Sequence, residues 1–256
     1  MGAITSIFSM LKQAGADVAQ LCYPSFCAAC KAEAPAGAYF CQRCEGELKL
    51  LTKAPACDRC AMPVAALGLP CPWCEGTGLK PYKHVARLGA FVDPLKGLIH
   101  QVKYHRRWST AEHLTDRLYA KPIVKQILDE TDVLLPVPLF ALRHVKRGFN
   151  QADVVACRLA TLAGKKVVRP VVRWRATETQ TRQHGRVKRL RNLRGAFVLV
   201  EPELVSGKRV TVVDDVLTTG ATLRTIARTM RDAKPVHLCA ITIAIADPEW
   251  NDFEKI

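Results

Sequence analysis

The chain has 256 residues, of which 49% are hydrophobic and 24% are charged, a composition that indicates a folded globular protein rather than a disordered one. Its longest near-continuous apolar run, residues 236–246, is well short of the roughly 20 residues that a membrane helix needs, so no transmembrane segment is expected. Lys and Arg exceed Asp and Glu by 38 to 23, and the resulting net charge of +15 indicates a polyanionic partner.

Residues 1–23 carry apolar side chains at helical spacing, among them Ile4, Ile7, Leu11 and Val18. This spacing predicts an amphipathic helix that packs on the body of the protein. The same segment has no basic start ahead of its apolar residues and no small-residue cleavage site, so a secretory signal is not expected. The predicted location is the cytoplasm.

Eight of the 11 cysteines form one pattern that occurs twice, at a distance of 30 residues. Each copy reads C-x2-C-x10-C-x2-C. The first contains Cys27, Cys30, Cys41 and Cys44, and the second contains Cys57, Cys60, Cys71 and Cys74. A C-x2-C turn presents two thiolates to one tetrahedral ion, and two such turns complete a four-cysteine zinc site. The sequence therefore predicts a double zinc ribbon over residues 24–80 with two structural Zn²⁺ sites.

Other interpretations of the cysteine pattern are less favoured. A disulfide framework is typical of secreted chains, and a redox-active site needs one C-x2-C pair rather than four. The pairing of the turns is open. A sequential arrangement within each repeat is expected, and a crossed arrangement, as in RING-type domains, is the alternative.

Residues 81–256 alternate between predicted strands and helices. In chain order we expect a strand at 84–91, helices at 94–103 and 108–118, a strand at 133–137, a helix at 150–163, a long loop at 173–194, strands at 196–200 and 209–213, a helix at 222–231 and a strand at 236–245. This alternation predicts an α/β fold with a mostly parallel sheet covered by helices on both faces.

The positive charge is concentrated in residues 141–194, which contain 15 Lys and Arg against two acidic residues. Phosphate, pyrophosphate and nucleic acid all fit such a segment as partners. The alternative is a solvated basic surface without a ligand. Aromatic residues, which stack on the bases of single-stranded nucleic acid, are few here, namely Phe149 and Trp174.

A strand that ends in two carboxylates, followed by a short Thr/Gly turn and a helix, is the strongest functional signal. In open α/β sheets ligands bind at the carboxyl ends of strands, and the N-terminus of a helix favours a phosphate dianion. Asp214 and Asp215 cannot favour the same phosphate, so we expect them to accept hydrogen bonds from the hydroxyl groups of a diol. A phosphate and a diol together describe a ribose 5-phosphate. The alternative is an ordinary strand-to-helix turn with a Thr cap and solvated acids.

The segment from Val212 to Thr222, Val-Val-Asp-Asp-Val-Leu-Thr-Thr-Gly-Ala-Thr, resembles the fingerprint of type I phosphoribosyltransferases, which holds the ribose 5-phosphate of phosphoribosyl pyrophosphate (PRPP). Two further segments, Leu135–Leu139 with Lys146–Gln151 and Thr179–Phe197, are similar to the ComF family. This resemblance covers nearly the whole chain from Cys27 onwards. It implies a type I phosphoribosyltransferase-like fold beside an N-terminal double zinc ribbon, and a link to DNA uptake or utilisation in natural competence.

The resemblance also implies roles for individual residues. Asp214, Asp215 and Arg147 would be catalytic, and PRPP would be bound together with Mg²⁺ by Leu217, Thr218, Thr219, Gly220, Ala221, Thr222, Val137 and Pro138. The implied reaction is pyrophosphate-releasing transfer of the phosphoribosyl group to an unknown acceptor, whose pocket would be built by residues 84–120. The alternative is a non-catalytic protein that senses PRPP or nucleotide and binds single-stranded DNA or DNA-uptake proteins through residues 141–194.

Overall fold

The computed structural model of the chain describes residues 26–66, 68–105, 108–140, 148–175 and 195–246. The chain divides into two compact units, residues 1–51 and 52–256, and the boundary falls within helix α2 (Gln42–Lys53). The predicted N-terminal helix at 1–23 lies outside the described residues. Within the described ranges, no helix is both long and apolar enough to cross a membrane.

The first unit contains the first cysteine repeat, and its local structure recurs in the second repeat. In the first repeat, the amide of Cys27 donates to the carbonyl of Ala32 at 2.8 Å, and Phe26 forms a short antiparallel bridge with Glu33. Thirty residues later, the amide of Cys57 donates to Met62 at 2.9 Å and a bridge forms between the equivalent pair, Ala56 and Pro63. The repeat in the sequence is therefore also a repeat in the structure.

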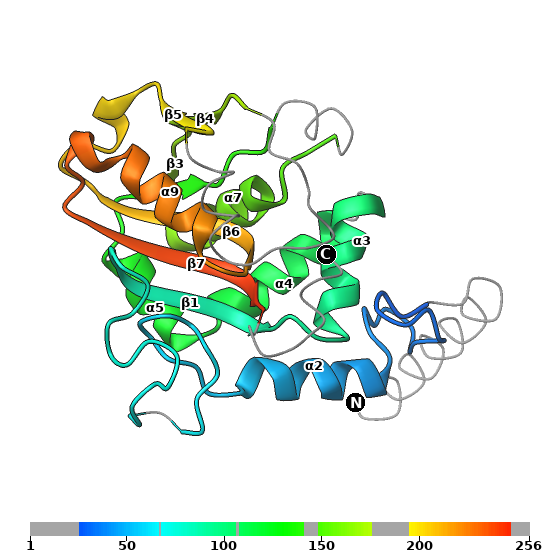
Figure 1. Ribbon diagram of the computed structural model, residues 1–256. Coiled ribbons are helices and arrows are strands. Elements are labelled where there is room, and N and C mark those ends of the chain that lie inside the picture. The colour runs from blue at the N-terminus through cyan, green and yellow to red at the C-terminus, as the bar shows by residue number, and fades with distance from the viewer. Residues whose placement is uncertain (1–25, 67, 106–107, 141–147, 176–194, 247–256) are drawn as a thin grey trace, which may run out of the picture. The chain divides into compact units, whose positions relative to one another are not determined.

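A five-stranded parallel sheet forms the centre of the second unit (Figure 1). Its strand order is β1-β7-β6-β2-β3, and every neighbouring pair is parallel. The strands are β1 (Tyr82–Ala90), β7 (His237–Ile245), β6 (Arg209–Leu217), β2 (Val133–Pro136) and β3 (Lys166–Val167). The sheet confirms the predicted α/β class.

Helices cover both faces of this sheet, as predicted (Figure 1). One face carries α3 (Leu95–His105), α4 (Trp108–Tyr119), α5 (Pro122–Asp129) and α7 (Gln151–Ala163), and the other carries α9 (Ala221–Thr229). Leu223 of α9 packs in one apolar cluster with Val212 of β6. Ile243 of β7 instead faces α3, α4 and α7. The near-complete burial of β2 and β7 follows from this double cover.

The second cysteine repeat is built into the second unit. Cys60, Cys71 and Cys74 are buried in the same apolar cluster as Leu223. The amide of Val85 in β1 donates to the carbonyl of Asp58 at 2.9 Å, which joins the repeat to the edge of the sheet. The two cysteine repeats therefore belong to different structural units.

Every strand and helix predicted for residues 81–256 is present, and the described residues of the whole chain contain four α-helices and strands that were not predicted. These are α2, α5, the two-residue β3 and β4 (Val171–Arg173), which pairs antiparallel with β5 (Phe197–Leu199). Helix α5 begins with Pro122 and buries Val124, Ile127 and Leu128. Eight residues are too few to show a clear helical period in the sequence.

Two details of the predicted boundaries differ in the structure. Strand β6 continues to Leu217 rather than ending at Val213, because its parallel pairing with β7 runs on to the pair Leu217–Ile245. The predicted loop at 173–194 begins with Arg173 as the last residue of β4, and residues 176–194 of it lie outside the described residues. Two short 3-10 helices, Pro202–Leu204 and Arg231–Ala233, complete the described elements.

Candidate active site and metal centres

The Thr/Gly motif lies where β6 ends and α9 begins. The strand ends at Leu217, residues 218–220 form a bend, and α9 starts at Ala221. Gly220 is the N-cap of α9 with a φ of +71°, a left-handed conformation that favours glycine. Thr218, Thr219 and Thr222 carry hydroxyl groups at or next to this bend, and each of the three residues is partly exposed.

The bend offers several hydrogen-bond donors. The first N–H groups of any α-helix have no acceptor within the helix, and the positive end of the helix dipole favours an anion there. The hydroxyl of Thr219 is buried and makes no hydrogen bond to the described residues. Arg224 of α9 donates from Nη1 to the carbonyl of Thr219 at 2.8 Å, which holds the bend in place. This arrangement suits a phosphate group.

Asp214 and Asp215 lie inside β6, so their side chains leave the strand on opposite faces. Asp214 shares the face of Val212, and Asp215 faces α3 and α7. Oδ1 of Asp214 accepts from the amide of Asp215 at 2.8 Å, and Oδ1 of Asp215 accepts from the amide of Val216 at 2.7 Å. Both carboxylates therefore lean toward the carboxyl end of the strand.

Lys103 of α3 is the partner of the second carboxylate. Its Nζ lies 3.0 Å from Oδ2 of Asp215, with 11% of the Lys103 side chain and 22% of the Asp215 side chain exposed. The sequence places Lys103 at the end of a predicted helix, but no spacing or motif there signals a role at the site. Only the folded chain brings α3 and β6 together at this point.

Burial raises the pKa of Asp214 to about 8, and the negative charge of Asp215 adds to this effect. Lys103 and Arg173 act in the opposite direction, as does the amide of Asp215. Asp214 is therefore mostly protonated at neutral pH and able to donate a hydrogen bond as well as accept one. The two neighbouring acids thus differ in their chemistry, because Lys103 pairs directly with only one of them.

Val137 and Pro138 directly follow β2, which pairs in parallel with β6. They therefore lie at the same end of the sheet as the bend that follows β6. The amide of Val137 donates to the carbonyl of Val213 at 2.8 Å. Asn150 donates from Nδ2 to the carbonyl of Val137 at 2.9 Å and accepts from the amide of Ala152 at 3.2 Å, as N-cap of α7. Asn150 therefore fixes the end of β2 against the start of α7.

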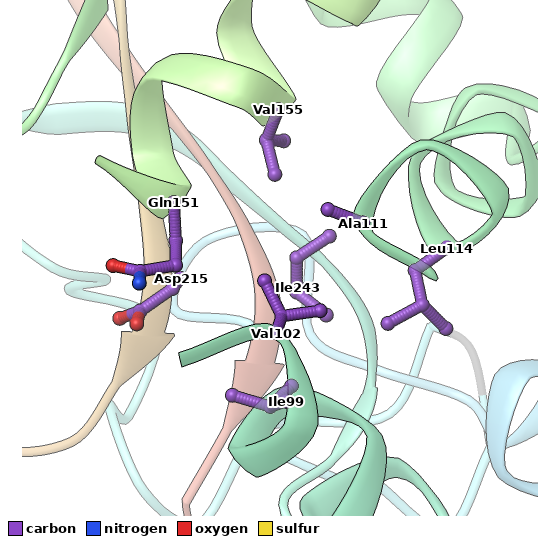
Figure 2. A pocket seen from close by; sticks show the side chains of 8 residues that line it. All are labelled: Ile99, Val102, Ala111, Leu114, Gln151, Val155, Asp215 and Ile243. Carbon is purple, nitrogen blue, oxygen red and sulfur yellow. The ribbon is translucent and has the colours of Figure 1, made fainter. Parts of the chain in front are cut away.

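A small pocket adjoins Asp215 on the face of α3, α4 and α7, and Figure 2 shows its lining. Its polar groups come from Asp215 and Gln151, and the rest of its lining is apolar: Ile99, Val102, Ala111, Leu114, Val155 and Ile243. Its interior volume is about 20 Å³, about the room that one water molecule needs. The pocket is therefore too small to hold a nucleobase or another acceptor of that size.

All but one of the residues predicted for the site lie within the described residues. The exception is Arg147, the third predicted catalytic residue. The other predicted residues lie together at the carboxyl ends of the neighbouring strands β2 and β6. They are Val137, Pro138, Asp214, Asp215 and residues 217–222. Sequence reasoning did not single out Lys103, or Leu79, whose side chain packs on the bend. Their roles depend on contacts between distant parts of the chain.

The cysteines form two separate groups, each made of the four cysteines of one repeat. The sulfur atoms of each group lie within 4.8 Å of one another. This is the sequential arrangement, and it is incompatible with crossed pairing. The Sγ–Sγ distances of 3.7 Å for Cys30–Cys41 and 3.6 Å for Cys60–Cys71 exceed the roughly 2.05 Å of a disulfide.

These distances match a zinc site. Four Zn–S bonds of about 2.3 Å in a tetrahedron place the sulfurs about 3.8 Å apart. Cys57 and Cys74 are separated by 3.9 Å, and the amide of Arg59 donates to the sulfur of Cys57 at 3.4 Å, as expected beside a thiolate ligand. Each group supplies four sulfur ligands and leaves no position for a substrate. The two groups therefore support structural Zn²⁺ sites.

Comparisons with known proteins agree with both parts of the chain. A double zinc ribbon domain matches residues 18–75, and a phosphoribosyl transferase domain matches residues 118–249. The DNA utilization protein YhgH of Escherichia coli O6:H1 is 33% identical over 81% of this chain and 91% of its own length. Competence protein F of Haemophilus influenzae is 30% identical over 73% of this chain and 83% of its own length.

A solved structure, glutamine PRPP amidotransferase from B. subtilis, matches 56% of this chain and 30% of its own, with 19% identity and a TM-score of 0.36. The parallel sheet, the bend at its carboxyl edge and the matched family define residues 118–249 as a phosphoribosyltransferase-type domain. The chain combines this domain with a double zinc ribbon, and it aligns with these relatives over most of its length. It therefore belongs to the ComF family.

Proposed function

We propose that the chain binds PRPP with Mg²⁺ and transfers its phosphoribosyl group to an acceptor, with release of pyrophosphate. One observation supports this proposal above all: three features lie together at the carboxyl ends of β6 and β2. They are the bend at 218–220 with its hydrogen-bond donors, the two acids of β6 and the residues that follow β2. A phosphate, a sugar diol and a pyrophosphate are the three parts of PRPP.

Each part of the ligand has its own residues in this proposal. The 5-phosphate binds to the amides at the start of α9 and to the hydroxyls of Thr218, Thr219 and Thr222. The buried hydroxyl of Thr219, which has no hydrogen-bond partner among the described residues, supports this role. The ribose hydroxyls bind to Asp214 and Asp215. Pyrophosphate lies against Val137 and Pro138, with Arg147 as a counter-charge.

The residues at the site fit an Mg²⁺ ion that arrives with its ligand. Magnesium prefers oxygen ligands and keeps several waters, so phosphorylated substrates usually supply much of its coordination. The site offers the carboxyl groups of Asp214 and Asp215, of which that of Asp215 already pairs with Lys103. The ion would neutralise charge on the leaving pyrophosphate. The protein itself would hold and orient the sugar and exclude water from it.

The proposed reaction is a substitution at the anomeric carbon of PRPP. The C1–O bond to pyrophosphate breaks and its electron pair leaves with pyrophosphate. A bond forms from the nucleophilic atom of the acceptor to C1, and the acceptor loses its proton to solvent. Positive charge develops on the ribose ring in the transition state, and a nearby carboxylate such as that of Asp215 stabilises such charge.

Calorimetric titration with PRPP, with and without Mg²⁺, tests binding. Asp215→Asn and Gly220→Val should each abolish measurable affinity while the circular dichroism spectrum stays unchanged. A screen of nucleobases and amines for pyrophosphate release then tests transfer and identifies the acceptor. Unchanged affinity in both variants would disprove the assignment of the site.

A second candidate function is the non-catalytic binding of single-stranded DNA, with PRPP or a nucleotide as a regulatory ligand. The net charge of residues 141–194 favours it, and so do two exposed aromatic side chains, Trp108 at 52% and Trp174 at 64%. Trp108 stacks on Phe149 at a centroid distance of 5.1 Å. Bases of a single strand stack on such side chains.

Salt dependence separates this candidate from the first. The affinity for a single strand should fall with salt by a logarithmic slope of about 0.7 per phosphate contact. Charge reversal at Arg186, Lys188 and Arg189 should remove this affinity. If DNA binding is absent or does not depend on salt, the second candidate is wrong, and the basic residues of 141–194 would serve only to bind pyrophosphate.

The relatives named for DNA utilization and competence support a role for this chain in DNA uptake or utilisation. We place that role in the cytoplasm, where thiolate zinc sites persist because the compartment is reducing. The two candidate functions are compatible in this context. A protein that handles incoming single strands could respond to the nucleotide precursor PRPP through the site at the end of β6.

A further inference from the structure

The second cysteine repeat lies directly against the bend at Gly220. Leu79, five residues after Cys74, is buried, and a Cβ atom at position 220 would lie 2.7 Å from its Cδ1 atom. That distance is shorter than real Cβ contacts, so Leu79 touches the backbone of the bend. The position of Leu79 therefore limits where this backbone can lie.

Leu79 is itself fixed by the second repeat. Its amide donates to the carbonyl of Arg59 at 3.1 Å, and Arg59 lies inside the first C-x2-C turn of that repeat. Gly78, with a φ of +68°, lets the chain pass so close to Arg59 that an added Cβ would lie 3.0 Å from its carbonyl oxygen. The cysteine ligands thus determine the position of Leu79 through this turn.

A second connection reaches the same helix. The carbonyl of Leu79 accepts from the amide of Tyr82 at 2.8 Å, and the buried hydroxyl of Tyr82 donates to the carbonyl of Leu223 at 2.7 Å. Leu223 lies in the first turn of α9. The segment that follows the second cysteine group therefore contacts both the bend and the first turn of α9, the helix that begins directly after the bend.

We propose that the second zinc ribbon is a positioning part of the phosphoribosyl site. Zinc held by Cys57, Cys60, Cys71 and Cys74 fixes Leu79 and Tyr82, and these two residues set the position of the bend and of the first amides of α9. The first cysteine group belongs to the other structural unit, and the proposal assigns it no role at the bend. The proposal rests on the proposed binding of a phosphoribosyl ligand at the bend.

Equivalent substitutions in the two repeats test it. Cys71→Ser and Cys41→Ser, each made in the whole 256-residue chain, change the same position of the repeat. Each variant should lose about one zinc ion per chain by mass spectrometry, because a four-cysteine site has lost one of its ligands. Cys71→Ser should weaken ribose 5-phosphate binding at least tenfold by calorimetry, since about 1 Å of misplacement at a site has effects of this size. Cys41→Ser should leave that affinity unchanged.

Hydrogen exchange provides a readout that does not depend on a ligand. Peptides covering residues 218–224 should exchange faster in Cys71→Ser than in Cys41→Ser, whereas peptides from β6 should exchange alike. A Cys71→Ser variant that loses zinc but keeps both affinity and slow exchange overturns the proposal. Equal losses in the two cysteine variants also overturn it.

Leu79 gives an independent test if the cysteine variant does not fold. Leu79→Ala should keep both zinc ions, weaken ligand binding and speed exchange at 218–224, and Leu79→Met should restore both. Leu128→Ala, at an equally buried position in α5, is the control and should leave affinity and exchange at the bend unchanged. If the wild-type chain binds no phosphoribosyl ligand, the proposed function fails, and the exchange data still decide whether the repeat positions the bend.

Discussion

Lys103 of α3 and Asp215 of β6 form a largely buried ion pair, with 3.0 Å between Nζ and Oδ2. The pair joins a helix on one face of the sheet to the strand that carries the proposed ligand site. It also places one positive charge beside two neighbouring acids. The electrostatics of the site therefore depend on a residue that lies 112 positions earlier in the chain.

Lys103→Met should destabilise the protein, because it leaves the carboxylate of Asp215 partly buried without its cation. We expect a loss of about 1–3 kcal/mol in the free energy of unfolding, measured by urea denaturation at pH 7. The double variant Lys103→Met/Asp215→Asn should recover part of this loss. A double variant that is less stable than the single one would contradict the assigned pairing.

Asp214→Asn should change how stability depends on pH. The folded-state pKa of Asp214 is raised from 3.8 to about 8, so between these values the folded protein holds a proton that the unfolded chain has lost. Stability from this group is therefore present below about pH 4 and falls as pH rises toward 8. The melting temperature of Asp214→Asn, compared with the wild type, should rise steadily over this range. A constant difference would mean that Asp214 is ionised throughout.

Asp132→Asn should show the opposite dependence. Hydrogen bonds from the side chain and the amide of Arg209 lower the pKa of Asp132 to about 2. A lowered carboxyl pKa stabilises the folded state above about pH 4, and this stabilisation is lost as pH falls toward 2. Both side chains are more than a third exposed, so we expect a loss of only about 0.5–1 kcal/mol at pH 7. Denaturation at pH 7 and pH 2.5 measures the difference, which should be clearly smaller at the lower pH.

Gly220→Ala should combine backbone strain with a steric clash. Gly164, the C-cap of α7, has a similar φ of +64° but no atom within 4 Å of an added Cβ, so Gly164→Ala measures strain without the clash. We expect Gly220→Ala to be the more destabilising by about 1–3 kcal/mol in urea denaturation. Adding Leu79→Ala to Gly220→Ala should remove most of this excess. Equal effects at the two glycines would show that Leu79 can move aside without cost.

Local patterns in the sequence predicted much of this molecule. The spacing of Cys27, Cys30, Cys41 and Cys44 and its repeat identified the two metal sites, because metal ligands need fixed short spacings. The helix expected at 150–163 is present as α7. The apolar runs of β2, β6 and β7 predicted a buried parallel sheet, because such strands read as continuous hydrophobic segments.

Features that depend on contacts between distant segments could not be predicted in this way. The extension of β6 to Leu217 comes from pairing with β7, and that register is not visible in the sequence of either strand. The contact of Leu79 with Gly220 spans 141 positions. The same holds for the division between the units inside α2. The two cysteine repeats look alike in the sequence, and it does not show that the second one is part of the unit that contains the sheet.

The hydrogen bond from Val85 to Asp58 has a consequence for handling the protein. Strand β1 is at the edge of the sheet, and an exposed strand edge recruits further strands from other molecules. The cysteine repeat caps part of this edge. Oxidation or chelation that loosens the repeat would uncover a template for intermolecular pairing. Metal-depleted preparations should therefore accumulate as aggregates, and reducing, zinc-containing buffers should keep the protein monodisperse.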